Sequence, residues 1–231
     1  ISVEQAKKNL RREIKNYKLK DVATAGRKIW NDELGKIQVA GGTQNDKFVF
    51  YTSLYRCLER PVNISEDGYY FSVYDNKVHE DAGYDYYTDD WIWDSYRAAH
   101  PLRILMDQKK QTNIIRSYLR MSELSSDHWF PNFPEVTGDS RRMNCNHGVA
   151  IIADAWYKGL RDFNLQEAYV YTKAGIEEKT LAPWSSAQSG WIDQFYKEKG
   201  YIPSLIPGEK ETVPEVNSFE KRQSVAVTLG T

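Results

Sequence analysis

The sequence contains little cysteine, no long apolar run and no excess of either charge. Its 231 residues include two cysteines, Cys57 and Cys145, which lie far apart and show no Cys-x-x-Cys spacing. This pattern indicates neither a zinc site nor a disulfide framework, and it leaves one disulfide between the two as an open alternative. Because no stretch of about 18 apolar residues occurs, the sequence predicts no membrane-spanning helix.

The charges balance almost completely, with 31 Lys and Arg against 32 Asp and Glu. Such a chain has no bulk field that would attract nucleic acid or an anionic membrane, so we expect neither as a partner. Aromatic residues are abundant, at 13% of the sequence with seven Trp and sixteen Tyr. Tyr and Trp combine an apolar ring with a hydroxyl or an indole N–H group, which suits a surface that binds sugars. The simpler alternative is that these rings fill the core.

Apolar periodicity and capping residues predict a helical chain interrupted by long loops. Residues 62–90, rich in Gly, Asp and Tyr, are expected to form an ordered loop with a short hairpin around Asp67-Gly68, and 125–148 a second long loop. A short final segment is expected over 220–229. The expected helices cover 3–16, 20–36, 47–60, 91–106, 108–123, 149–160 and 165–179.

This alternation of helices and long loops is typical of an all-α fold in which helical hairpins form a ring, with long loops on one rim. A ring of this type needs about twelve helices, and the sequence predicts only seven or eight. The last segment also stops without a capping residue, and the chain begins at Ile1 without a targeting leader. We therefore expect these residues to be one part of a longer domain.

The segment 91–102, WIWDSYRAAHPL, places two opposite charges among aromatic residues. In a helix over 91–106, Asp94 and Arg97 would project from one face with Trp93 at its edge. One interpretation is an intrahelical ion pair. The other is a sugar-binding pair, because charges buried among aromatic rings need further hydrogen-bond partners and sugar hydroxyls would supply them.

The loop 125–148 carries the carboxylates Glu135 and Asp139 beside aromatic residues. An apolar pocket holds a proton on a carboxylic acid, which is what a glycosidic general acid requires. The alternative for Asp139 is that it caps a turn after Gly138. His147 precedes an apolar helix and is expected to be structural rather than a ligand.

Two stretches, YYTDDWIWDSYRAAHPL and HGVAIIADAWYKGLRDF, resemble glycoside hydrolase family 92, the calcium-dependent exo-acting α-mannosidases. The segments FYTSLYRCLERP and DGYYFSVYDNKVH are also similar to this family, and the resemblance covers nearly the whole chain. It implies an (α/α)6 barrel that follows a β-sandwich in complete members. It also implies inverting hydrolysis of terminal α-mannose in glycans, with Ca2+ bound to O2 and O3 of the sugar.

The resemblance assigns roles to several residues. Trp93, Asp94 and Arg97 fall on positions that line the terminal-sugar subsite, and Asp139 falls on the general-acid position. The family has glutamate and threonine there, whereas this chain has Asp139-Ser140. Aspartate is one methylene shorter and small misplacements are costly in rate, so Glu135 is the fallback acid.

The resemblance also marks what this chain lacks. Members specific for α-1,2 links carry a His-Glu pair where Arg222 and Gln223 stand here, which implies that this link is not preferred. The general base and the main calcium ligands belong to motifs downstream of the sequence. The expectation is therefore the first half of a barrel, inactive alone, from a secreted or periplasmic enzyme. The alternative is a non-catalytic carbohydrate-binding or interaction protein on the same scaffold.

Overall fold

The computed structural model describes residues 1–141, 146–179, 189–201, 203–205 and 208–212. In these residues helices dominate, and the remaining regular structure is three two-stranded antiparallel sheets, β1–β4, β2–β3 and β5–β6. The helices are α1 (Val3–Glu13), α2 (Leu19–Leu34), α3 (Gln44–Leu58), α4 (Ile92–Ser95), α5 (Ala99–Met106), α6 (Gln108–Leu124), α7 (Gly148–Tyr157), α8 (Leu165–Glu177) and α9 (Trp191–Lys199). The strands are β1 (Val62–Asn63), β2 (Tyr69–Ser72), β3 (Lys77–Glu80), β4 (Tyr87–Thr88), β5 (Pro134–Glu135) and β6 (Gly138–Asp139).

Side-chain caps fix where several helices begin. The hydroxyl of Ser2 accepts from the backbone N–H of Gln5 at 3.0 Å and starts α1. At α3, Thr43 and Asp46 form a reciprocal capping box, with the Thr43 N–H donating to Asp46 at 2.7 Å. These local signals explain where α1 and α3 begin, and α2 begins at Leu19 without a side-chain cap. The helices expected over 3–16, 20–36 and 47–60 are present with shifts of a few residues at their ends.

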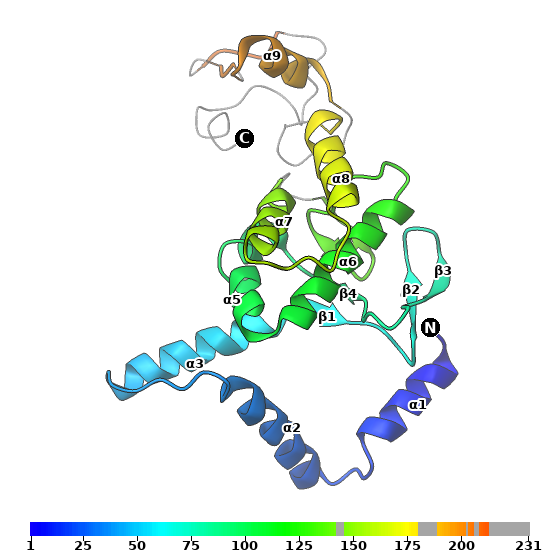
Figure 1. Ribbon diagram of the computed structural model, residues 1–231, viewed down its shortest axis with the longest axis vertical. Helices are drawn as coiled ribbons and strands as arrows, with labels where there is room; N and C mark the ends of the chain where they lie inside the picture. The colour runs from blue at the N-terminus through cyan, green and yellow to red at the C-terminus, as the bar shows by residue number, and fades with distance from the viewer. Residues whose placement is uncertain (142–145, 180–188, 202, 206–207, 213–231) are drawn as a thin grey trace.

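The core is built around α6. Ten of its 17 residues are buried, and α5, α8 and β4 pack against it. Ile92, Ile114 and Tyr118 have no exposed surface. In Figure 1 the helices α5 to α8 gather in the middle of the molecule, while α1 and α2 extend away from them and have no buried residue.

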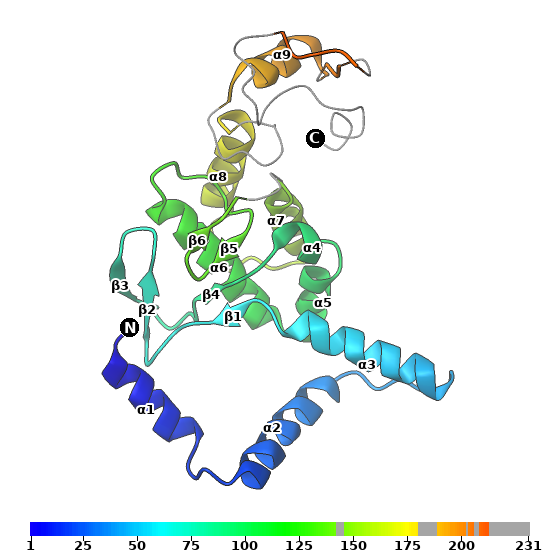
Figure 2. The ribbon, with the colours of Figure 1, turned by 180° about the vertical axis from the view of Figure 1, so that it is seen from behind.

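The expected helix-rich fold is confirmed, with the short sheets as an addition to the all-α prediction. Figures 1 and 2 show the described helices in an open arrangement rather than a closed ring. The (α/α)6 barrel with long loops on one rim therefore stays a prediction.

The single helix expected over 91–106 is wrong, because the chain turns at 96–98 between α4 and α5. The cause lies in Pro101. It has no N–H to donate to the carbonyl of residue 97, and its ring would clash there, so a helix through this point is kinked or broken. Proline is tolerated in a first helical turn, which is where Pro101 stands in α5.

Two other elements differ from expectation. The tight turn at Asp67-Gly68 is present, with φ of 53° and 91°, but the loop also forms the longer hairpin β2–β3. Helix α9 was not predicted, although Gly200 at its end, with φ of 78°, is a typical stop signal. The segment expected over 220–229 lies outside the described residues.

Candidate functional site

A buried polar network fixes the start of the segment 90–97. Asp90 accepts from the Tyr118 hydroxyl at 2.6 Å and contacts His100 Nε2 at 2.9 Å, and all three side chains are almost completely buried. Burial alone would raise the pKa of Asp90, but the hydrogen bond and attraction from His100, with Arg103 and Tyr118, hold it well below its usual range. The network anchors the backbone directly before the Trp-Asp motif.

Backbone hydrogen bonds bring this segment beside the second loop. Asp90 N donates to Pro134 O at 2.9 Å and Ile92 N donates to Asn132 O at 3.3 Å. Next to these backbone bonds, the rings of Trp93 and Phe133 make an edge-to-face contact with their centroids 6.3 Å apart. The Trp-Asp segment and the carboxylate-bearing loop, distant in sequence, are therefore neighbours in the fold.

The end of the segment contacts the start of α7. The ring of Tyr96 lies 4.1 Å from that of His147, and Arg97 donates to the Tyr96 hydroxyl at 3.1 Å. Burial and then the positive charge of Arg97 lower the pKa of His147. The imidazole is therefore neutral at pH 7, and no described atom forms a hydrogen bond with its Nδ1.

The side chains of Asp94 and Arg97 are exposed, and they do not form an ion pair with each other. The expectation that they are buried charges in a core helix is wrong, because α4 ends before Arg97. Trp93 is 37% exposed. Asp94 and Trp91 instead line an open hollow of about 230 Å³, so a ligand can reach this carboxylate.

Asp139 lies in the hairpin β5–β6, and its carboxylate is 4% exposed. Oδ1 accepts from the backbone N–H of Phe133 at 2.8 Å and of Arg141 at 3.1 Å, and Oδ2 accepts from Asn132 N at 3.0 Å. This is the turn-stabilising arrangement that the sequence left as the alternative. Both oxygens of the expected general acid are already occupied by donors.

Arg141 holds the same hairpin from its end. Its guanidinium pairs with Asp127, reaches Asp139 Oδ2 at 3.5 Å and lies 4.9 Å above the Trp129 ring. Burial lowers the pKa of Arg141, but the two carboxylates raise it further, so it stays charged. Its backbone φ of 49° is uncommon for a side-chain-bearing residue, which indicates that these contacts define the local conformation.

Glu135, the fallback acid, is held more loosely. It is half-buried, and its Oε1 accepts from the Ser140 hydroxyl at 3.3 Å. The next residue, Val136, is 55% exposed at the tip of the hairpin. Among the described residues Glu135 therefore has fewer hydrogen-bond partners than Asp139, with one against three.

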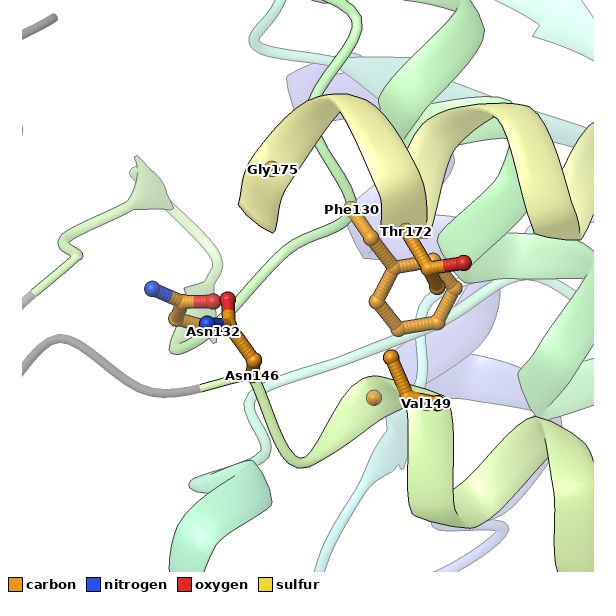
Figure 3. Close-up of a pocket in the computed structure, with 7 residues that line it drawn as sticks. Phe130, Asn132, Asn146, Val149, Thr172 and Gly175 are labelled. Atoms are coloured by element: carbon orange, nitrogen blue, oxygen red, sulfur yellow. The ribbon is translucent and has the colours of Figure 1, made fainter. Parts of the chain in front are cut away.

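A small cavity lies behind the loop, shown in Figure 3. It measures about 10 Å³, which is room for a single water and not for a sugar. A Cβ on Gly148 would lie 2.3 Å from Phe130 Cδ1, so only glycine fits at the start of α7. The lining residues are Phe130, Asn132, Asn146, Gly148, Val149, Thr172 and Gly175.

The described residues contain no cluster of three or more His, Cys, Asp or Glu side chains that could hold a metal ion, so they do not form the implied calcium site. Arg222, Gln223 and Cys145 lie outside the described residues, and Cys57 is a free thiol. Across the part of the chain that the structure describes, no helix is long and apolar enough to cross a bilayer.

Carboxylates and exposed aromatic rings on the loops of a helical scaffold are features typical of surfaces that bind carbohydrate. The family model of the glycosyl hydrolase family 92 catalytic domain matches residues 5–231. Because this match spans nearly the whole sequence, the chain belongs to glycosyl hydrolase family 92.

Solved structures agree with this assignment. The GH92 inverting mannosidase BT2199 from Bacteroides thetaiotaomicron VPI-5482 is 29% identical, with a TM-score of 0.75, and the match covers 88% of this chain and 27% of that one. The GH92 α-mannosidase BT3965 from Bacteroides thetaiotaomicron is 25% identical, with a TM-score of 0.74 over 88% of this chain and 26% of that one. The chain thus spans about a quarter of the length of these structures. No curated protein matched it.

Proposed function

We propose that the parent protein carrying this chain hydrolyses terminal α-linked mannose from glycans with inversion of configuration. The observation that supports this best is the pair of backbone hydrogen bonds joining 90–92 to 132–134, which brings the Trp-Asp motif beside two carboxylates. Family membership supports it as well. Among similar structures, BT2199 is described as an inverting mannosidase, and BT3965 as an α-mannosidase that was also solved with mannoimidazole.

The exposed groups of the segment suit a sugar. The Trp93 ring offers an apolar face for the C–H side of a pyranose, at an exposure of 37%. Asp94 accepts hydrogen bonds from hydroxyls, and Arg97 donates them. Since these two charges do not neutralise each other, both remain available to a ligand.

An inverting glycosidase needs two carboxyl groups, about 6.5–9.5 Å apart. One protonates the leaving oxygen, and the other activates a water on the opposite face of the sugar. In this proposal the hairpin β5–β6 supplies the acid, and the base belongs to another part of the parent protein. Calcium is implied by the family, but the described residues do not fit it, and no step is derived through it.

A non-catalytic carbohydrate-binding protein is the second candidate. It is favoured by the three backbone N–H groups that occupy the Asp139 carboxylate, because a carboxylate bound in this way is suited to stabilising a turn. On this alternative the segment 90–97 would still hold a sugar, and no bond would be cleaved.

The two candidates are separated by following mannose release from α-mannobiose by the parent protein, with β-mannosides and α-glucosides as comparison substrates. Asp94→Ala is expected to lower kcat/KM on the α-mannoside roughly 10- to 100-fold, because hydrogen bonds to a charged group are lost. Asp21→Ala, at an exposed position of α2, is the matched control and should change nothing.

The same assay with an added chelator tests whether hydrolysis requires calcium. Hydrolysis is expected to stop with the chelator and to recover when Ca2+ is added back. Saturable mannose binding without hydrolysis would favour the second candidate. Absence of both binding and hydrolysis would contradict both proposals.

A further inference from the structure

We infer that Glu135 is the proton donor of the proposed reaction and that Asp139 is a positioning residue. This rests on the proposed function, and it departs from the role that the family resemblance gives to Asp139. Three properties of the hairpin support the inference: which carboxylate oxygens have hydrogen-bond partners, which face each side chain lies on, and which contacts hold the hairpin in place.

Both oxygens of the Asp139 carboxylate already accept hydrogen bonds from the backbone. They accept from the N–H groups of Asn132, Phe133 and Arg141 at 2.8–3.1 Å. On Oδ1 two N–H donors fill both acceptor positions, and Oδ2 has one N–H donor with the charged Arg141 Nε 3.5 Å away, so a proton on this carboxyl group would lie close to other donors. Rotating the side chain toward a sugar would leave these N–H groups without an acceptor, which is costly in a buried loop.

The strand register places the side chains of Glu135 and Asp139 on opposite faces of the hairpin. Pro134 pairs with Asp139 and Glu135 with Gly138, and the pairing continues through the bond from Ser140 N to Phe133 O at 3.1 Å. Cross-strand partners share a face, and successive residues alternate between faces. Phe133, Glu135 and Ser140 therefore share one face, in agreement with the 3.3 Å hydrogen bond from Ser140 to Glu135. Asp139 belongs to the other face.

The face that carries Glu135 is the one turned toward the sugar-binding segment. Phe133, two residues before Glu135, contacts Trp93 with ring centroids 6.3 Å apart. Glu135 is half-buried on the same face of the hairpin as Phe133, and its reach is one methylene longer than that of an aspartate. It also keeps free acceptor capacity, since only the Ser140 hydroxyl bonds to it among the described residues.

Asp139 and Arg141 position this face. The Asp139 carboxylate fixes the backbone at 132–133, and Arg141 ties the hairpin to Asp127 and Trp129. Because 132–134 is also bonded to 90–92, the same contacts set the distance between the proton donor and the Trp-Asp segment.

In the proposed step, the Glu135 O–H proton moves to the glycosidic oxygen as the bond from that oxygen to C1 breaks, and the leaving sugar departs as an alcohol. Water forms the new bond to C1 and gives its proton to the carboxylate base required elsewhere in the parent protein. Glu135 ends as a carboxylate and regains its proton from solvent.

The test compares Glu135→Gln and Asp139→Asn in the parent protein on two substrates. One is α-mannobiose, whose leaving group needs protonation, and the other is 2,4-dinitrophenyl α-mannoside, whose leaving group does not. Glu135→Gln is expected to lower kcat on mannobiose by about 100-fold or more and on the aryl mannoside by much less, with an unchanged Tm.

Asp139→Asn is expected to lower the Tm and to affect both substrates equally, because it loosens the hairpin without removing the proton donor. The inference is overturned if Asp139→Asn shows the leaving-group dependence and Glu135→Gln does not. If Asp139→Asn yields no folded protein, Glu135→Gln alone tests the inference: a similar loss of kcat on mannobiose and on the aryl mannoside would overturn the proton-donor role of Glu135.

A failure of the proposed function can be distinguished from a failure of the inference about Glu135 and Asp139. A parent protein that cleaves neither mannoside contradicts that function and the donor role of Glu135. The positioning role of Asp139 is then judged by the Tm values, and equal values for the two variants would overturn it.

Discussion

Replacing Tyr118 by phenylalanine tests the network that anchors the candidate site. The Tyr118 hydroxyl donates to Asp90 Oδ2 at 2.6 Å, and both side chains are almost completely buried. The substitution keeps the ring and its packing, so it opens no cavity. A hydrogen bond to a charged group contributes about 1.5–3 kcal/mol, and the free energy of opening this region should fall by that amount.

Tyr74→Phe is the matched control, because it makes the same chemical change at another buried position. No described atom accepts or donates a hydrogen bond at the Tyr74 hydroxyl, and burial raises the pKa of that group. An unpaired buried hydroxyl is unfavourable, so removing it should be neutral or stabilising. The two substitutions are therefore expected to differ in sign or in size.

The assay is amide hydrogen exchange of the parent protein, read by mass spectrometry on peptides that cover 86–94. This method reports the free energy of local opening of the segment itself. Tyr118→Phe should speed exchange in these peptides roughly 10- to 150-fold, the equivalent of 1.5–3 kcal/mol. Equal effects of the two substitutions, or a larger effect of Tyr74→Phe, would refute the reasoning.

Two further predictions concern the surroundings of the site. The pKa of Asp90 is lowered in the folded protein, so its stabilising contribution is present above the ordinary Asp pKa of about 3.9 and is lost as the pH falls below it. Fluorescence-detected denaturation should show wild type well above Asp90→Asn in stability at neutral pH, with the gap narrowing below about pH 4; a gap independent of pH would contradict this. Gly148→Ala places a Cβ 2.3 Å from Phe130 and should cost about 1–3 kcal/mol, whereas Gly26→Ala, with open space in α2, should be neutral or stabilising by up to about 1 kcal/mol. The same denaturation experiment compares them, and an equal response at both glycines would argue against a tight contact at Phe130.

Much of the helical framework follows from local signals. Ser2 and the Thr43 and Asp46 pair are side-chain caps that act within one turn, and for that reason they can be identified without the fold. The break between α4 and α5 has a local signal as well, in Pro101, whereas the apolar run over 91–106 favours one continuous helix. The end of α9 at Gly200 was a similar local signal.

The candidate site depends on contacts that no local pattern contains. The backbone bonds from 90–92 to 132–134 join segments distant in the chain, and periodicity carries no information about such pairing. The same limit applies to Asp139. Its residue type and place after Gly138 fit both a general acid and a turn cap, and only the positions of three backbone N–H groups distinguish its present partners. The family resemblance supplied the motif but could not supply the side-chain direction.

The central claim is that the parent protein is an inverting α-mannoside hydrolase whose sugar lies on Trp93 and Asp94. The most direct measurement is the ¹H NMR spectrum of the mannobiose reaction in its first minutes, before the released sugar mutarotates. The account predicts that β-mannose appears first with the wild-type parent protein and that Asp94→Ala slows its appearance. Initial release of α-mannose, or the same rate for Asp94→Ala and wild type, would contradict it.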